Sequence, residues 1–246
     1  MKEVVFLGSK SIGYECFKIL IKNQKILKFK IKAVLTNKKR SAELLHFCNE
    51  NNIRVLNSLE EYLSLENVDI AISVQYHEIL KLKHIEKAKD ITINLHMAPL
   101  PEYRGCNQFS YAIINEDKEF GTTIHRLEEG IDSGQILFEK RFPIKANSWV
   151  SELYDLTFQK SIELFTQSLK KIITGDYTLT SQESLLSTRA CSIHYRSEIN
   201  SLKKLDLNWD IETISRYVRA TYMPGFPPPY IILQEKKFFL EMEKVI

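Results

Sequence analysis

Residues 91–105 read Ile91-Thr92-Ile93-Asn94-Leu95-His96-Met97-Ala98-Pro99-Leu100-Pro101-Glu102-Tyr103-Arg104-Gly105, and this stretch decides the fold of the chain. Its β-branched start predicts a strand, so Asn94 and His96 lie at the end of that strand and, two residues apart, project to one face. Pro99 and Pro101 prevent a helix directly afterwards. Because open α/β sheets bind ligands at the carboxyl ends of their strands, Asn94 and His96 are candidate site residues.

A second loop delivers a third polar group. Strands are predicted at residues 122–127 and 135–142, and Gly130-Ile131-Asp132-Ser133-Gly134 joins them. Asp132 lies at the centre of this loop. Taken singly, each of the three residues also has an ordinary interpretation: a partly buried histidine, a turn-forming asparagine and a loop aspartate.

The first half of the chain alternates strands with helices. Buried strands are predicted at residues 3–7, 53–56 and 69–74, and helices at residues 12–25 and 41–51. This alternation predicts an α/β fold with a mostly parallel sheet and flanking helices.

The longest helix is predicted at residues 148–174. Ser148 is its predicted N-cap, as Ser41 is for the helix at residues 41–51. Apolar residues recur along it at helical spacing, which predicts a face that packs on the core. They are Phe158, Ile162, Phe165, Leu169 and Ile172.

The sequence changes character after Gly175. Residues 175–208 are rich in Ser and Thr and predict a long surface excursion with short strands. We therefore divide the chain into a domain at residues 1–175 and a C-terminal extension at residues 176–246. The extension is predicted to hold a helix at residues 210–219 and a β-hairpin at residues 230–240.

Composition indicates an ordinary soluble protein. The chain has 246 residues, of which 44% are hydrophobic and 26% charged, and its formal charge of +3 is too small to name a partner. It has no apolar run of about 18 residues and no signal peptide, which favours the cytoplasm and no membrane partner. Its four cysteines and six histidines are dispersed, so neither a disulfide framework nor a metal is predicted.

Two stretches near the N-terminus suggest contact with a nucleotide or a nucleic acid. The turn at residues 8–13 lacks the central glycine of the dinucleotide fingerprint, so we do not expect NAD, although Ser9 or Lys10 can contact a phosphate of another ligand. Residues 16–42 hold many basic side chains and no acidic one. Because lysines alternate with apolar residues at 28–33, a solvated strand is favoured over nucleic-acid contact, and no nucleic-acid partner is expected.

Four motifs together resemble the folate-dependent formyltransferases. They are Asn-x-His at residues 94–96, Leu-Pro-x-Tyr-Arg-Gly at 100–105, Gly-x-Thr-x-His at 121–125 and Gly-Ile-Asp-x-Gly-x-Ile at 130–136. The resemblance covers residues 1–140, with one departure: Met97-Ala98 stands where the family more often has Pro-Ser or Gly-Ser. It implies a Rossmann-like formyltransferase fold, with 10-formyltetrahydrofolate as formyl donor, tetrahydrofolate as its product and no metal.

The resemblance also implies that Asn94, His96 and Asp132 are catalytic. Formyl transfer to an amine needs a base, a donor to the oxyanion and a route for a proton. Histidine suits the proton shuttle, and an asparagine amide can stabilise the oxyanion by about 3 kcal/mol, as donors do in other acyl-transfer enzymes. A carboxylate beside the imidazole orients it and favours its protonated form.

Binding residues are expected around this triad. The resemblance places the pterin of the folate against the loop after residue 74, and the folate-binding residues are then Gln75, Tyr76, Ile79, Leu95 and Gly130. A nucleotide-linked acceptor needs aromatic rings for its base and cations or backbone donors for its diphosphate. The residues expected to bind it are Ser9, Lys10, Arg104, Tyr222, Phe226 and Tyr230.

The tail at residues 209–230 resembles the sugar-nucleotide N-formyltransferases of lipopolysaccharide O-antigen and other surface-polysaccharide biosynthesis. The expected acceptor is thus a nucleotide-linked amino-deoxy sugar, with thymidine diphosphate as the nucleotide, and the enzyme is a possible homodimer. Methionyl-tRNA formyltransferase is an alternative, although its larger C-terminal domain finds little room after Gly175. Other folate-dependent amine formyltransferases, a hydrolase of the same folate, and an inactive folate-binding regulatory domain are further alternatives.

Overall fold

The computed structural model describes residues 1–39 and 41–241. A seven-stranded sheet forms its centre, in the order β3-β2-β1-β4-β5-β7-β8. Its strands are β1 (Lys2–Gly8), β2 (Phe29–Leu35), β3 (Val55–Leu56), β4 (Ile70–Val74), β5 (Ile91–His96), β7 (Glu119–Arg126) and β8 (Ile136–Pro143). The strands from β3 to β5 run parallel, whereas β7 and β8 each pair antiparallel with their neighbours. The predicted α/β fold with a mostly parallel sheet is confirmed.

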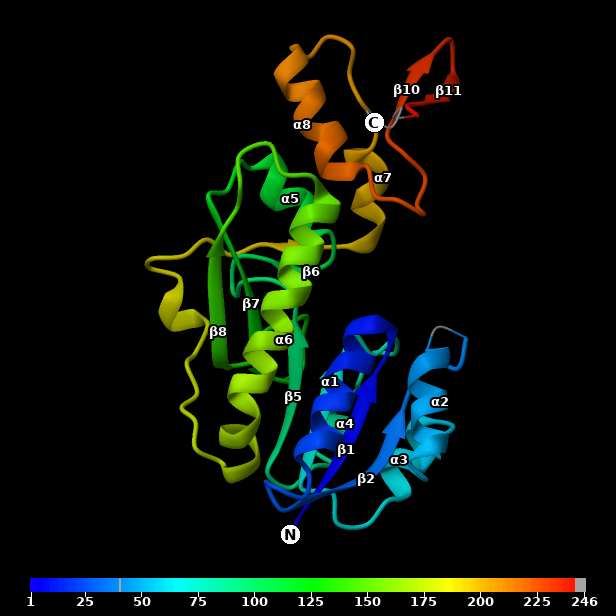
Figure 1. The fold of residues 1–246 in the computed structure, drawn as a ribbon. Coiled ribbons are helices and arrows are strands. Elements are labelled where there is room, and N and C mark those ends of the chain that lie inside the picture. Colours follow the sequence, from blue (N-terminus) through cyan, green and yellow to red (C-terminus); the bar gives the residue numbers. More distant parts are fainter. Residues whose placement is uncertain (40, 242–246) are drawn as a thin grey trace.

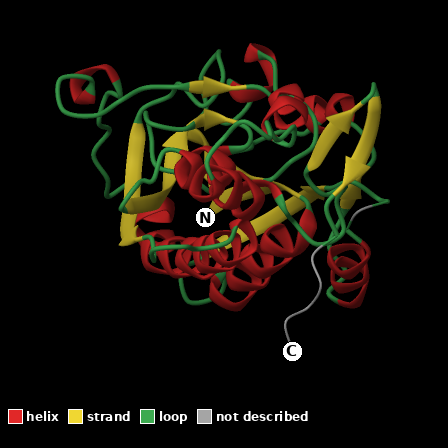
Figure 2. Ribbon diagram, turned by 90° about the horizontal axis from the view of Figure 1, so that it is seen from above, coloured by secondary structure: helices red, strands yellow, loops and turns green. Residues whose placement is uncertain are grey.

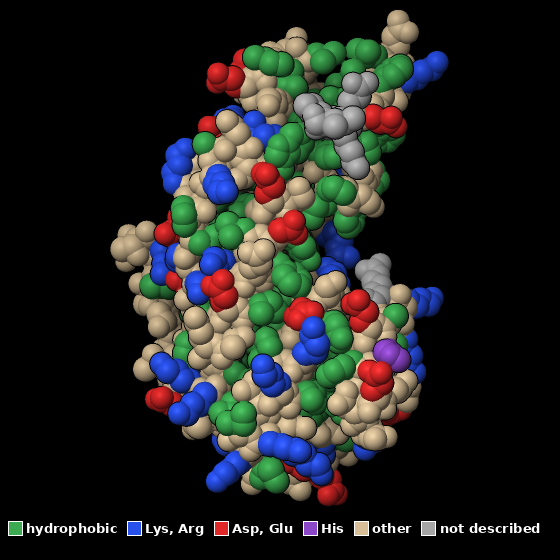
Figure 3. All heavy atoms as spheres, in the orientation of Figure 1, with side chains coloured by type: hydrophobic (Ala, Val, Ile, Leu, Met, Phe, Trp, Pro, Cys, Tyr) green, Lys and Arg blue, Asp and Glu red, His purple; other side chains and the backbone are tan. Residues whose placement is uncertain are grey.

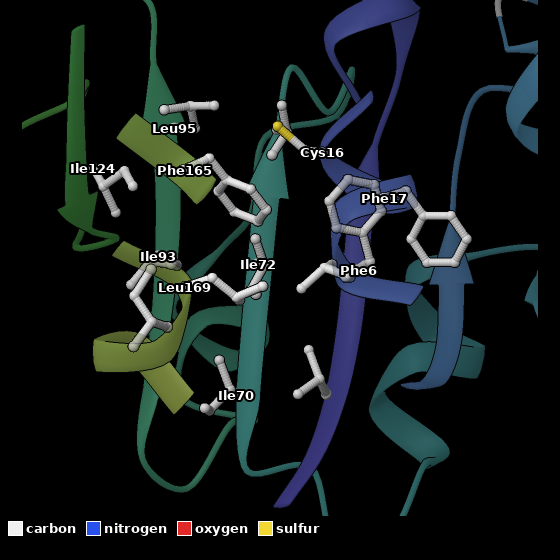
Figure 4. Close-up of a cluster of buried hydrophobic side chains, with 14 of the residues drawn as sticks. Phe6, Cys16, Phe17, Ile70, Ile72, Ile93, Leu95, Ile124, Phe165 and Leu169 are labelled. Carbon is white, nitrogen blue, oxygen red and sulfur yellow. The ribbon is translucent and has the colours of Figure 1, made fainter. Parts of the chain in front are cut away.

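Helices cover both faces of this sheet. The α-helices of the described residues are α1 (Lys10–Asn23), α2 (Ala42–Glu50), α3 (Leu59–Ser64), α4 (Leu82–Ile85), α5 (Gln108–Ile114), α6 (Val150–Thr174), α7 (Ile199–Leu202) and α8 (Ile211–Thr221). Figure 1 shows α1 and α6 in front of the strands. On that face, Phe6 of β1 packs with Phe17 of α1 and Phe165 of α6 in one buried cluster (Figure 4). Because a parallel sheet is buried on both faces, the neighbouring residues of β1 join a second cluster on the other side, with α3.

The same alternation along β5 separates core residues from site residues. Ile93 and Leu95 lie in the cluster with α1 and α6 (Figure 4). Asn94 and His96 therefore face the opposite side of the sheet, as the two-residue period of a strand requires. The prediction that Asn94 and His96 project to one face of the strand is confirmed.

The C-terminal elements lie beyond the carboxyl ends of the parallel strands (Figure 1). They include α7, α8 and the antiparallel hairpin of β10 (Tyr230–Leu233) and β11 (Lys236–Phe239). Seen from above, the hairpin and β8 lie on opposite sides of the molecule (Figure 2). These C-terminal elements thus lie at the end of the sheet where the candidate residues Asn94 and His96 are found (Figure 1).

Several sequence expectations about local structure need correction. The long helix begins at Val150 and not at Ser148: Trp149 is at the cap position, and its backbone N–H donates to the Glu152 carboxylate. Ser41 precedes α2, but its side chain makes no capping hydrogen bond. Helices α3 and α4 were not predicted. Their apolar residues are too few to give a clear helical period.

The predicted surface excursion at residues 175–208 is only partly a surface feature. Its β9 (Ile193–His194) pairs in parallel with β6 (Arg104–Gly105), a strand that begins at the Tyr-Arg-Gly motif. Gln182 and Lys203 are buried. A Ser/Thr-rich segment without a hydrophobic period therefore still packs closely against the Tyr-Arg-Gly segment of the first half. The boundary at Gly175 stays a prediction.

The lysine-rich stretch near the N-terminus includes β2. In β2, Phe29 and Ile31 are buried while Lys30 is exposed, so the alternation predicted for the lysine-rich stretch is present. Arg40, part of the same basic stretch, lies outside the described residues. Lys and Arg are interspersed with Asp and Glu on the face shown in Figure 3. Within residues 1–39 and 41–241, no helix is long and apolar enough to cross a membrane.

Candidate active site

The antiparallel pairing of β5 with β7 adds a second histidine to the candidate residues. Asn94 lies directly opposite His125, and Asn94 Nδ2 is 3.3 Å from His125 Nε2. The His125 side chain is fully buried. The sequence motif Gly-x-Thr-x-His contained His125 but gave it no role, since only the register of the two strands brings it to Asn94.

Asp132 lies between the two imidazoles. Its Oδ2 is 3.5 Å from His96 Nδ1, and its Oδ1 is 3.4 Å from His125 Nε2. The backbone N–H of Gly105 donates to Oδ2 at 3.0 Å. The structure thus brings together Asn94, His96 and Asp132, which the sequence singled out, and adds His125.

Two glycines let the backbone approach closely enough for this arrangement. A Cβ on Gly105, whose φ is +87°, would lie 2.3 Å from the carbonyl oxygen of His194 in β9. A Cβ on Gly134 would lie 1.9 Å from the carbonyl oxygen of Arg126. Any side chain at either position would displace the loops that carry Asp132 and its hydrogen-bond donor.

The Asp132 carboxyl is held in its charged form. Burial raises its pKa, but the charge of His96, the contact with His125 and the hydrogen bond from Gly105 together lower the pKa well below its usual range. Asp132 is therefore a carboxylate at neutral pH and can accept, but not donate, hydrogen bonds.

The backbone partners fix which nitrogen of each imidazole carries a proton. His96 Nε2 is 2.7 Å from the carbonyl oxygen of Tyr103, and His125 Nδ1 is 2.9 Å from that of Arg126. A carbonyl oxygen only accepts, so each of these nitrogens donates. The opposite nitrogen of each ring faces Asp132, and a second proton taken up there would be stabilised by the carboxylate.

A first cavity of about 700 Å³ opens beside this cluster. Asn94 and Asp132 line it, together with Tyr76, Ile79 and Gly130, three of the residues predicted to bind folate. Leu95, also predicted for folate, is buried and is not among the described residues that line the cavity.

A second cavity, of about 310 Å³, has Gly105 in its wall. Its lining includes Lys10, Gln75 and Phe226. Gln75 was predicted to bind folate, but in the structure its Oε1 accepts a hydrogen bond from Lys10 Nζ at 2.9 Å. Arg196 and Lys203, which the sequence did not suggest, also line this cavity.

The remaining residues predicted for the acceptor do not converge. The Tyr222 ring packs edge-on against Trp149, and the Tyr230 ring packs against Phe239 within the hairpin. Ser9 is buried. Among the described residues, only Lys10 and Phe226 of that predicted set line the second cavity. Arg104 lies next to Gly105, and its Nε donates to the Gln182 side chain.

His96 lines neither cavity and lies between them, 5% exposed. Its Nδ1 faces Asp132, which lines the first cavity, and the residue after it, Met97, lines the second. No group of three His, Cys, Asp or Glu side chains in the described part of the chain is arranged to hold a metal ion.

Comparison with known proteins places this geometry in context. A family model described as "Formyl transferase" matches residues 21–169. The chain is 26% identical over 174 residues to the GDP-perosamine N-formyltransferase of Brucella melitensis, covering 70% of this chain and 64% of the relative. It is 30% identical over 186 residues to the methionyl-tRNA formyltransferase of Listeria monocytogenes, covering 76% of this chain and 57% of the relative. The match thus spans less than two thirds of each relative.

One solved structure resembles the chain over nearly its whole length. It is the N-formyltransferase of Helicobacter canadensis in complex with folinic acid and dTDP-3-aminofucose. The two chains are 26% identical and superimpose with a TM-score of 0.78, over 96% of this chain and 86% of the other.

Proposed function

The chain belongs to the formyl transferase family, and from this membership we propose that it transfers a formyl group from 10-formyltetrahydrofolate to the amine of a nucleotide-linked amino sugar. One observation carries the proposal. Asp132 lines the first cavity, and its hydrogen-bond partner Gly105 lines the second. Two substrates bound in these cavities would meet at the carboxylate and the adjacent imidazoles, as a two-substrate transfer requires.

The first cavity fits the folate. Its walls carry apolar and aromatic side chains suited to a flat pteridine ring, among them Tyr76, Leu80, Ile85 and Leu127. The donor carries the formyl group on a nitrogen, and it leaves as tetrahydrofolate once that nitrogen has lost the formyl group and taken up a proton. Asn94 and Asp132 both line this cavity, and the Asn94 amide keeps a second N–H beside the one directed at His125. We assign that N–H to the oxyanion.

The second cavity fits a nucleotide-linked acceptor. Lys10, Arg196 and Lys203 offer three cations for a diphosphate, and Phe226 offers a ring on which a base can stack. The proton released by the attacking amine passes to the side of His96 that faces Asp132. Asp132 stabilises it there until it is delivered to the leaving nitrogen.

The relatives support a sugar nucleotide and leave its base open. The Brucella relative is named for a GDP-sugar, and the Helicobacter structure contains a dTDP-sugar. We propose the thymidine nucleotide, and with it a cytoplasmic role in making surface polysaccharide such as the lipopolysaccharide O-antigen. The test is a panel of purified acceptors with 10-formyltetrahydrofolate: dTDP-linked and GDP-linked amino-deoxyhexoses, the free amino sugars, and charged initiator tRNA.

The expected result is rapid formylation of the dTDP-linked sugar and poor formylation of the free sugar. Robust formylation of initiator tRNA would instead make the protein a methionyl-tRNA formyltransferase, the alternative favoured by its 30% identity to the Listeria relative. No transfer to any amine, with folate still bound, would indicate an inactive folate-binding domain. An Asn94 and His96 double variant is the negative control.

A further inference from the structure

Gln182 is a buried amide that neither the family motifs nor the proposed reaction uses. It lies just before the short helix η1 (Glu183–Leu185), and only 2% of it is exposed. A buried amide is costly unless its polar atoms are hydrogen-bonded. The partners of Gln182 therefore indicate what holds it there.

The side-chain partners of Gln182 belong to the Asp132 loop and to β6, the two segments that carry Asp132 and Gly105. Gln182 Nε2 donates to the carbonyl oxygen of Asp132 at 2.8 Å and to that of Gly134 at 2.7 Å. Gln182 Oε1 accepts from Arg104 Nε at 2.9 Å. Both amide hydrogens are used, so this single side chain ties the Asp132 loop to the strand β6 that carries Gly105.

The Asp132 loop depends on such ties. Asp132 has a φ of +46°, in the left-handed region that is unfavourable for a residue with a side chain. A conformation of this kind persists when the surroundings hold it, and it is common at functional sites. The two hydrogen bonds from Gln182 hold the backbone on both sides of Ser133, and the bond from Gly105 holds the carboxylate.

We propose that Gln182 is a positioning residue, which fixes the backbone of Asp132 so that its carboxylate lies between His96 and His125. The inference rests on the proposed formyl transfer, because only a reaction at Asp132 makes its placement matter for turnover. Gln182 is not among the described residues that line either cavity, so its effect on the reaction passes through the placement of Asp132.

Two variants separate its hydrogen bonds. Gln182→Glu keeps an acceptor for Arg104 but loses both donors, whereas Gln182→Met keeps the length of the side chain and loses every hydrogen bond. The matched controls are Gln167→Glu and Gln167→Met, at an exposed position of α6. Gln182→Asn, which retains the amide but withdraws it by one methylene, serves if the first two fail to fold.

Two readouts are needed. In the formyl-transfer assay, both Gln182 variants are expected to lower kcat by at least about tenfold, with KM for either substrate changed far less, because displaced catalytic groups cost turnover more than ground-state binding. The Gln167 controls are expected to keep wild-type kcat. If the Gln182→Glu variant folds and turns over at the wild-type rate, the two donated bonds do not position Asp132 and the proposal is wrong.

The second readout does not need activity. The carboxyl ¹³C resonance of Asp132, followed from pH 6 to about pH 3, is expected to begin titrating at higher pH in the Gln182 variants than in the wild type, because the carboxylate then moves away from His96, His125 and the Gly105 N–H. An unchanged titration contradicts the positioning role. If wild-type protein transfers no formyl group, the proposed function fails, while this titration still decides the placement of Asp132.

Discussion

At the scale of single residues, His96 combines deep burial with contact to both site loops. Its Nε2 donates to the Tyr103 carbonyl, so the only nitrogen able to take up a proton is Nδ1, facing Asp132. We predict that His96→Asn lowers kcat by at least about 100-fold, while folate affinity stays close to that of the wild type, because the loss is confined to proton transfer. Initial rates and a folate titration measure the two effects.

The matched control for this variant is His46→Asn. His46 lies on α2 with its side chain 75% exposed, and it lines neither cavity. It is expected to retain wild-type turnover. A His96→Asn enzyme that kept a tenth of the wild-type kcat would show that the imidazole is not the proton carrier.

The low pKa of the Asp132 carboxyl leads to a prediction about how stability depends on pH. Its pKa is lower in the folded protein than the value of about 3.9 expected in the unfolded chain. The ionised carboxylate therefore stabilises the folded state when the pH is above about 3.9. This contribution is lost as pH falls below about 4, because the unfolded chain then binds the proton more readily. We predict that the free energy of unfolding falls less steeply from pH 5 to pH 3 in Asp132→Asn than in the wild type.

Urea denaturation at each pH measures this slope. Asp176→Asn, at an exposed position after α6, controls for the loss of one carboxylate. Equal slopes in Asp132→Asn and wild type would mean that the carboxylate gains nothing from its neighbours in the folded state.

At the scale of elements, local patterns predicted most of the fold. The continuous apolar runs of β1 and β4 and the stripe of α6 are visible in the sequence because β4 and most of β1 are buried and one face of α6 packs on the core. β6 was not predicted, and the short strands expected within residues 175–208 were given no positions, since two-residue strands such as β9 exist only through their pairing. His125 and Gln182 were missed for the same reason: strand register and contacts between residues 48 to 78 positions apart bring them to the site.

The loop between β7 and β8 can be tested as an element. Gly134→Ala places a Cβ against the Arg126 carbonyl and is expected to cost about 1–3 kcal/mol of stability, together with a loss of turnover, because the Asp132 loop must move. Gly175→Ala, at the left-handed C-cap of α6, meets no atom within 4 Å. It is expected to cost about 1 kcal/mol from backbone strain alone and to leave kcat unchanged. Full activity in Gly134→Ala would contradict the tight fit seen here.

At the scale of the whole molecule, the C-terminal hairpin leaves apolar side chains in contact with solvent. Leu233, Phe238 and Phe239 are each 45–54% exposed. A two-stranded hairpin is marginally stable alone, so a second copy of the chain that covers it would stabilise both. We predict a homodimer through this hairpin. Light scattering should give twice the monomer mass of 28.7 kDa, and Phe239→Glu should give the monomer. A monomeric wild type at micromolar concentration would exclude this interface.

The last prediction concerns the second cavity, which the tail and the first half of the chain line together and which we propose for the acceptor. Phe226 is 66% exposed, yet it lines the second cavity with Lys10 from the start of α1, more than 200 positions away in the chain. An exposed ring at a cavity wall leaves a face on which a flat base can stack, and the cations of the same cavity would favour a nucleotide there. Phe226→Ala is therefore expected to raise KM for the sugar nucleotide at least about tenfold, as the loss of one stacked base costs about 1–3 kcal/mol.

Two comparisons isolate that effect. KM for the folate should stay unchanged in Phe226→Ala, because no described residue of the tail lines the first cavity, which we propose for the folate. Tyr222→Ala is the contrasting variant: its ring packs on Trp149 and not in the cavity, so it should lower thermal stability more than acceptor affinity. If Tyr222→Ala raised the acceptor KM while Phe226→Ala did not, the nucleotide would lie on the α6 side of the tail and the second cavity would not be its site.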